Sequence, residues 1–179
     1  FGDQPMALAK FIHYPPTPTG GAGVNPHHDA GFLTVLAPGP TPGLQVQNQE
    51  GGWVDVPVID NTFVINLGEV LQLMTGNYLV ATPHRVIANE ERISAGYFHG
   101  PSLTTPLTRL PLAPRFADAV EASPHHHDAG LMPTPAEADE GTAAMTSEYK
   151  PETYGEQLWN YFSRSYPDQM ALHHPATAS

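Results

Sequence analysis

The sequence predicts a mainly β fold of two packed sheets, a jelly roll or a barrel, with a few short helices. Two observations carry this prediction. The 179 residues include 20 Pro and 16 Gly, which divide the chain into short pieces. Between them lie at least seven short runs with the pattern of strands and one brief helical run. Many short strands with frequent turns are typical of sandwiches and barrels.

The first half of the predicted core alternates strands and turns. A strand is expected over residues 7–14, and it ends at a pair of prolines that cannot donate to a β-ladder. Residues 19–23 are predicted to form a glycine-rich loop. Further strands are expected over residues 33–36 and 44–47, separated by a Pro- and Gly-rich turn.

The second half adds strands around one helix. Residues 69–75 predict a short helix, with Glu69 near its positive end and Gly76 as a left-handed stop. Four runs bounded by turn residues predict the remaining strands, over residues 53–56, 62–67, 78–88 and 92–98.

The tail beyond the strands is different in kind. Residues 111–114 suggest a last edge strand, and residues 115–122 a short amphipathic helix. Thr153 and Glu156 match a capping box, which opens a helix with an aromatic stripe. We expect this helix to pack over the β core rather than to form a dimer contact. The histidine run at residues 125–127 has no spaced partner and suggests a solvated loop.

Length and composition fit one domain over residues 1–179, with a core over about 6–114 and a helical tail over 115–179. Lys+Arg 7 against Asp+Glu 18 gives a charge of −11, which disfavours nucleic acid and anionic membrane surfaces as partners. There is no cysteine for thiolate ligation, no apolar run of membrane-spanning length and no secretory pattern. We therefore expect a cytoplasmic protein that acts on a small molecule.

One stretch, residues 25–31, carries chemistry. His27 and Asp29 are two residues apart, so on a strand they share one face and can close on one ion. His28 should then turn away. His84 is the best placed third ligand. Two His and one carboxylate on one face of an octahedron is the arrangement of non-haem Fe(II) oxygenases.

A second pair with the same spacing is Arg92 and Ser94. The planar fork of an arginine matches a carboxylate, and a serine hydroxyl can donate a further hydrogen bond. Because the chain has so few Lys and Arg, an arginine within an apolar strand predicts a ligand clamp.

The motifs occur in a recognisable order: His27-x-Asp29, Gly43-Leu44-Gln45-Val46, Gly52-Trp53-Val54-Asp55-Val56-Pro57, Asn66-Leu67-Gly68-Glu69, Thr82-Pro83-His84-Arg85-Val86, Arg92-x-Ser94 and Tyr154-Gly155-Glu156-Gln157-Leu158-Trp159. This series resembles the isopenicillin N synthase-like family of 2-oxoglutarate/Fe(II)-dependent dioxygenases. The resemblance implies a double-stranded β-helix, or jelly roll, and a chain that is the C-terminal catalytic portion of a longer architecture.

The resemblance also implies the site and the reaction. Iron would bind to His27, Asp29 and His84, and the distal carboxylate of 2-oxoglutarate to Arg92 and Ser94. With O2, oxidative decarboxylation of 2-oxoglutarate would drive hydroxylation, or a related oxidation, of a small-molecule substrate.

Two further residues are candidates for the site. Tyr14 matches a family tyrosine that hydrogen-bonds the co-substrate or the substrate. Phe98 shares the strand face of Arg92 and Ser94, and is either core or a wall of the substrate pocket.

One departure from the family pattern leaves an alternative open. Many 2-oxoglutarate users have an Asn two residues before the tyrosine, whereas this chain has Ile12, which is similar to isopenicillin N synthase itself. An oxoacid-independent Fe(II) oxidase or oxidative cyclase, of that type or of the aminocyclopropane-carboxylate oxidase type, is therefore the alternative. A zinc hydrolase or a non-catalytic jelly-roll binding module explains less, because neither needs the clamp at Arg92 and Ser94.

Overall fold

The computed structural model describes residues 4–17, 21–121 and 151–174. The strands in these ranges are β1 (Met6–Tyr14), β2 (Ala22–His27), β3 (Leu33–Ala37), β4 (Leu44–Gln47), β5 (Trp53–Asp55), β6 (Val64–Leu67), β7 (His84–Ile87) and β8 (Arg92–Gly100). The helices are α1 (Glu69–Met74), α2 (Pro114–Glu121), α4 (Tyr154–Ser165) and α5 (Pro167–His173).

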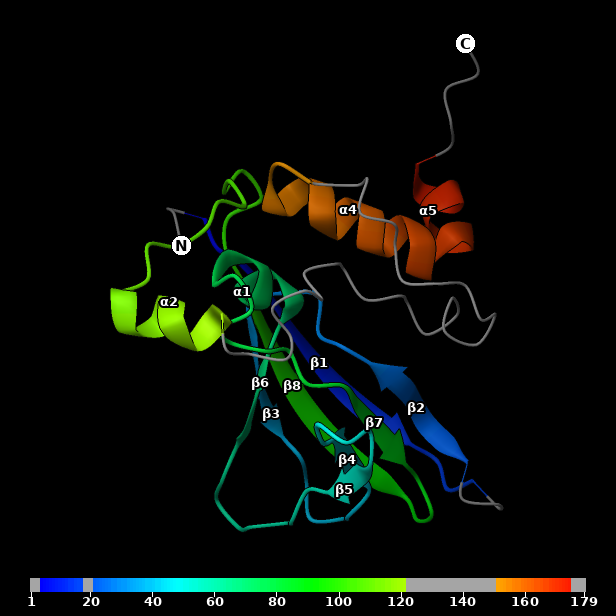
Figure 1. Ribbon diagram of the computed structural model, residues 1–179. Coiled ribbons are helices and arrows are strands. Elements are labelled where there is room, and N and C mark those ends of the chain that lie inside the picture. The colour runs from blue at the N-terminus through cyan, green and yellow to red at the C-terminus, as the bar shows by residue number, and fades with distance from the viewer. Residues whose placement is uncertain (1–3, 18–20, 122–150, 175–179) are drawn as a thin grey trace.

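The strands form two four-stranded sheets, in the orders β1-β8-β3-β6 and β2-β7-β4-β5. Every neighbouring pair is antiparallel. The helices gather at one end of this sandwich, where α1 and α4 lie near each other (Figure 1). The predicted mainly β, two-sheet architecture with a few flanking helices is confirmed. That the whole chain is one domain stays a prediction.

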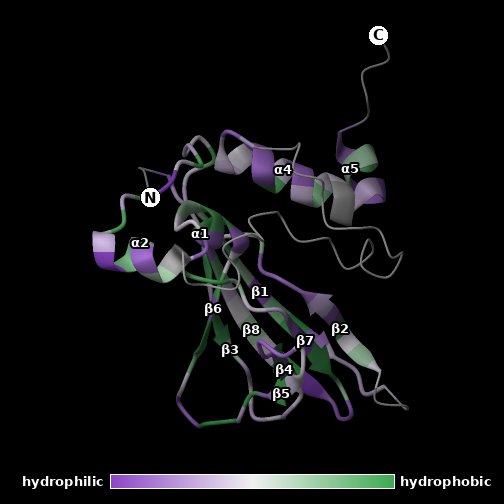
Figure 2. Ribbon diagram, viewed as in Figure 1, coloured by the Kyte–Doolittle hydropathy of each residue, from purple (hydrophilic) through white to green (hydrophobic). Residues whose placement is uncertain are grey.

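The core between the sheets comes from strand alternation. Along β8, Arg92 and Ser94 are buried, whereas Ile93 between them is 59% exposed. Buried Tyr14 and Val86, from opposite sheets, belong to one apolar cluster. β3 is hydrophobic through most of its length (Figure 2). The inner faces of both sheets are therefore apolar, with a few buried polar groups set among them.

The predicted strand over residues 78–88 is too long, since β7 begins only at His84. The preceding segment turns instead: the Ala81 backbone N–H donates to the Gln72 side chain, at 2.8 Å, rather than to a neighbouring strand. Pro83 has no N–H to offer a ladder. Because the Gln72 side chain accepts from the Ala81 N–H, this N–H does not require a hydrogen bond to a neighbouring strand.

Two further expectations are wrong at the level of single elements, and one helix was not predicted. Residues 111–114 form no strand, because prolines at both ends remove donors, and α2 begins at the second of them. The predicted loop over residues 19–23 is shorter, since β2 begins at Ala22. Helix α5 was not expected. It begins directly after α4, with proline at its first position.

The tail helix α4 packs as predicted. Thr153 and Glu156 make the capping box in both directions. Tyr154, at the start of the helix, is buried against Val70 and Met74 of α1. The histidine run at residues 125–127 lies outside the described residues. Within the described ranges, no helix is both long and apolar enough to cross a membrane.

The loop that follows β2 is held by the first turn of α1. Glu69 N–H donates to the Asp29 carbonyl at 2.8 Å, and Val70 N–H donates to the Gly31 carbonyl at 3.2 Å. Gly68 N–H donates to the Phe32 carbonyl at 2.9 Å. These amides have no partner within the helix, so the loop satisfies them while they fix its position.

Gly68→Ala should destabilise the fold, because a Cβ at this position would collide with the Gly31 carbonyl group. Neither backbone segment can move without breaking the hydrogen bonds just described. We expect a loss of about 1–3 kcal/mol in the free energy of unfolding, the range for overpacking. Urea unfolding measures it. Gly21→Ala is the matched control, since its Cβ would make only ordinary contacts with Thr17; an equal loss in both variants would contradict this explanation.

Candidate metal centre

Three predicted ligands meet at the helical end of the sandwich. His27, Asp29 and His84 each offer a ligand atom, and these atoms lie within 4.8 Å of one another. Asp29 and His84 are buried, and His27 is half-buried. His27 and His84 face each other across β2 and β7, with ring centroids 4.3 Å apart.

A bulge in β2 creates this pairing. Val24 pairs with Val86 and His27 with His84, so three residues along β2 match two along β7. Pro26 lies in this irregular step, where its missing N–H costs no ladder bond. Bulges re-aim side chains near functional sites, and this one brings the His27 ring to the His84 ring.

Asp29 reaches the cluster from a loop, not from the strand. β2 ends at His27, so the predicted sharing of one strand face does not explain the convergence. The Asp29 backbone is instead held by Glu69 of α1. The predicted set of three is brought together, and His28, between two of its members, is not part of it.

Both cluster histidines are oriented through Nδ1. The Nδ1 of His27 donates to the Asn25 carbonyl at 2.9 Å, and the Nδ1 of His84 donates to the Thr82 carbonyl at 3.1 Å. Each ring then presents Nε2 as an acceptor, which is the tautomer a metal ligand requires. The Nε2 of His84 lies 3.8 Å from Oδ1 of Asp29.

The surroundings lower the pKa of two imidazoles, those of His27 and His28. Burial, followed by the neighbouring His84, lowers the pKa of His27 below its usual 6.5. Burial, and then His84 and His27, lowers the pKa of His28 to about 4. Neutral imidazole is the form that binds a cation, so the His27 ring is ready for one at neutral pH.

These depressed pKa values predict acid sensitivity of the metal-free protein. As the pH falls from about 6.5 towards 4, the unfolded chain binds a proton at residue 28 that the folded chain does not. The free energy of unfolding should therefore fall, by up to about 3 kcal/mol for His28. Urea unfolding at about pH 7 and about pH 4.5 measures the loss. His28→Asn has no titrating ring and should lose less; the same loss in both proteins would rule out His28 as the cause.

A second buried charge lies farther along the inner face. Arg92 is 1% exposed, and it donates from Nη2 to the Pro38 carbonyl at 2.9 Å and from Nε to the Thr41 carbonyl at 3.3 Å. Its guanidinium lies 5.0 Å from the ring centroid of Tyr14, whose hydroxyl is 3.2 Å from the Ser94 hydroxyl. The predicted trio of Arg92, Ser94 and Tyr14 is therefore one contiguous group.

Two buried charged side chains keep an atom without a partner among the described residues. These atoms are Oδ2 of Asp29 and Nη1 of Arg92. An unpaired buried charge is costly unless a ligand completes it. The acceptor fits a cation and the donor fits a carboxylate. The donor set therefore suits a metal ion together with an anionic ligand.

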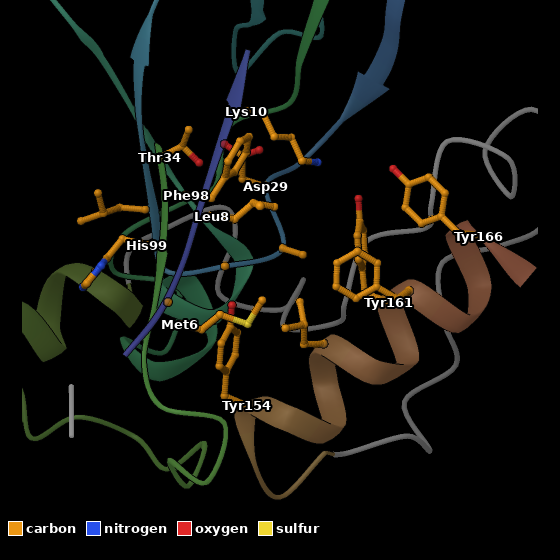
Figure 3. A pocket seen from close by; sticks show the side chains of 16 residues that line it. Met6, Leu8, Lys10, Asp29, Thr34, Phe98, His99, Tyr154, Tyr161 and Tyr166 are labelled. Atoms are coloured by element: carbon orange, nitrogen blue, oxygen red, sulfur yellow. The ribbon is translucent and has the colours of Figure 1, made fainter. Parts of the chain in front are cut away.

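A pocket opens beside Asp29, with about 620 Å³ of empty space that is partly open to solvent. Phe98 lines it, as do Tyr154, Tyr161 and Tyr166 from the tail (Figure 3). The period of two predicted the inward direction of Phe98.

Sequence reasoning missed Lys10, which also lines the pocket. The alternation in β1 that places it on the face of Tyr14 could have found it. Sequence reasoning also missed Gln157, a buried side chain that donates to the Ala30 carbonyl at 3.2 Å. No local pattern predicts that contact, because the two residues are far apart in the chain.

Comparison with known proteins identifies relatives. The chain is 38% identical over 118 residues to gibberellin 2-beta-dioxygenase 1 of Arabidopsis thaliana, covering 58% of this chain and 36% of that protein. It is 32% identical over 170 residues to a 2-oxoglutarate-dependent dioxygenase of Gibberella zeae, covering 88% and 44%. The chain thus spans less than half the length of these relatives.

A solved structure shares the fold. A full-length Neurospora crassa protein in complex with alpha-KG superposes with a TM-score of 0.65 at 23% identity, over 89% of this chain and 45% of that one. This likeness supports the jelly-roll prediction for the architecture. Residues 3–101 match the model of the 2OG-Fe(II) oxygenase superfamily, and this range includes every site residue predicted above. The predicted family and the cofactors that its name specifies are confirmed, and this chain belongs to the 2OG-Fe(II) oxygenase superfamily.

Proposed function

We propose that this protein is an Fe(II) oxygenase that couples oxidative decarboxylation of 2-oxoglutarate to oxidation of a small-molecule substrate. One observation carries the proposal: among the described residues, the buried Asp29 carboxylate and the buried Arg92 guanidinium each keep an unpartnered atom. The first suits the metal and the second suits the co-substrate, and both belong to a chain of this superfamily.

His27 and His84 would hold the metal through Nε2, and Asp29 would hold it through its carboxylate. The two carbonyls that accept from Nδ1 fix both rings, so binding needs no change of tautomer. Two neutral imidazoles and one carboxylate leave a divalent ion with net charge +1, which favours a dianionic oxoacid beside it. When bound, the iron supplies the redox chemistry with O2.

Arg92 would bind the distal carboxylate of 2-oxoglutarate. Its Nε and Nη2 are held by backbone carbonyls, so the planar group is fixed and Nη1 is presented as the remaining donor. Ser94 and Tyr14 would add hydroxyls from the same group. A pre-oriented guanidinium loses little conformational freedom on binding.

Phe98 would form one wall of the substrate pocket. Leu158, Tyr161 and Phe162 of α4 line the same pocket beside Asp29. The predicted exclusion of nucleic acid rests on the net charge of −11, and the cytoplasmic location stays a prediction.

Ile12 favours the oxoacid-independent alternative. It pairs with Ser94 across β1 and β8 and packs against the cluster that contains Tyr14. The hydrocarbon side chain of Ile12 therefore occupies the position at which many 2-oxoglutarate users have an Asn. The amide of such an Asn could bind a carboxylate. In that case Arg92 would hold a substrate carboxylate directly.

Product analysis distinguishes the 2-oxoglutarate-dependent reaction from the oxoacid-independent alternative. The iron-loaded protein is given 2-oxoglutarate and a panel of small organic acids, while O2 and succinate are both measured. The proposal predicts succinate in step with O2 consumption. O2 consumption with no succinate would refute it and support the alternative.

A further inference from the structure

The pocket beside Asp29 contains a cation that the proposed function does not use. We propose that this pocket binds a small carboxylic acid with an apolar or aromatic body, and that Lys10 pairs with its carboxylate. This inference rests on the proposed function and names its class of substrate. Among the described residues that line the pocket, Lys10 is the only Lys or Arg.

Lys10 lies four residues before Tyr14, on the same side of β1 by strand alternation, and its side chain is exposed at the edge of the pocket. It pairs with Gly96 across β1 and β8. Because Gly96 has no side chain, the Phe98 ring can lie close to it, and Nζ of Lys10 lies 5.2 Å from the centroid of this ring. The ammonium is thus held at the pocket wall by a cation–π contact.

The charge of Lys10 has no counterpart in the described part of the chain. No carboxylate pairs with Lys10 there, whereas His13 pairs with Glu91. Other cations are engaged elsewhere: Arg85 lies 4.2 Å from the ring centroid of Trp53 and donates to Gln45. The Lys10 side chain is exposed, so its ammonium can be reached by a ligand that enters the pocket.

The loaded site would not supply that partner. A divalent iron carries +2, Asp29 carries −1, Arg92 carries +1 and 2-oxoglutarate carries −2, so these four groups sum to zero. Lys10 then remains as one uncompensated positive charge. A ligand with a single carboxylate balances it, whereas a phosphate dianion would bring excess negative charge.

The other side chains that line the pocket indicate that the part of the ligand away from its carboxylate is apolar or aromatic. Phe98 and Leu8 come from the sheet, and Leu158, Tyr161 and Phe162 come from α4. In Figure 3 the Lys10 ammonium and the hydroxyls of Tyr161 and Tyr166 point to the same side of the pocket. Apolar walls with polar groups on one side suit an apolar or aromatic body with an acid at one end.

The test uses the full chain loaded with Mn²⁺ and saturated with 2-oxoglutarate, so that no reaction occurs. The probes are phenylacetic, cinnamic and octanoic acids, each compared with its uncharged primary amide. Broadening of the probe's proton NMR lines by Mn²⁺ reports both binding and nearness to the metal. We expect at least one acid to bind up to about 5-fold more tightly than its amide, the upper end for an exposed ion pair.

Variants assign that preference to Lys10. Lys10→Met should reduce acid binding to the level of the amide, and Lys10→Arg should retain most of the preference. Arg115→Met is the matched control for lost charge, because Arg115 stacks over Phe116 on α2 and does not line the pocket. It should behave as wild type.

Two results would overturn the inference: no acid binds better than its amide, or the preference survives in Lys10→Met. Retention of 2-oxoglutarate is measured in the same samples. This measurement distinguishes failure of the proposed function from failure of the inference about Lys10. If the wild-type protein does not hold 2-oxoglutarate, the proposed function fails and this inference fails with it. If 2-oxoglutarate is held but the acids show no preference, this inference alone fails.

Discussion

Asp29→Ala is expected to abolish stable iron binding. Asp29 is the only carboxylate in the cluster, and its Oδ2 has no partner in the described part of the protein. Without it, two neutral imidazoles remain and the negative charge is lost. We expect affinity for Fe(II) to fall by more than about 100-fold, since loss of a group that merely orients a ligand can cost that much. Iron per chain after anaerobic loading measures it.

His28→Ala is the matched control for this change. His28 is adjacent in sequence, is the same residue type as the two other ligands and lies outside the cluster. It should retain iron, whereas His84→Ala should lose it as Asp29→Ala does. Iron loss in His28→Ala equal to that in His84→Ala, or full iron content in His84→Ala, would show that the ligand set is wrong.

Arg92→Lys is expected to weaken 2-oxoglutarate binding by about 1.5–3 kcal/mol, the range for hydrogen bonds to charged groups. Lysine keeps the charge, but its donors all lie on one nitrogen and cannot reproduce the spread of a guanidinium that reaches two carbonyls through Nε and Nη2 and presents Nη1. Titration of 2-oxoglutarate into the Mn²⁺-loaded protein gives the dissociation constant. Iron content should be unchanged.

Because Arg92 is almost fully buried, its replacement is checked by thermal unfolding and by a second variant. Ser94→Ala removes a smaller group and should cost about 1 kcal/mol in the same titration. Arg85→Lys, on β7 and stacked on Trp53, is the matched control and should leave binding unchanged. Wild-type affinity in both Arg92→Lys and Ser94→Ala would disprove the clamp.

Local periodicity predicted much of this site. Arg92, Ser94 and Phe98 share a face because strand alternation depends only on spacing, and the structure places all three inward. The capping box at Thr153 was predictable for the same reason, since its two partners are three residues apart. Features set by neighbours in sequence were therefore accessible from the sequence.

Features set by tertiary contacts were not. Asp29 approaches His27 because α1 holds its loop, although sequence spacing suggested a shared strand face. The pairing of His27 with His84 depends on a bulge whose register no local pattern specifies. The role of α4 in lining the pocket depends on how the tail folds back, and only its amphipathic character was predictable.

The most direct test of the central claim is an anaerobic titration of the Fe(II)-loaded protein with 2-oxoglutarate, followed by visible absorption. Chelation of the oxoacid by iron on His27, Asp29 and His84 should produce a weak charge-transfer band. The band should appear in wild type and in His28→Ala, and it should be absent in Asp29→Ala. A wild-type protein that holds iron yet shows no band at saturating 2-oxoglutarate would contradict the proposed function.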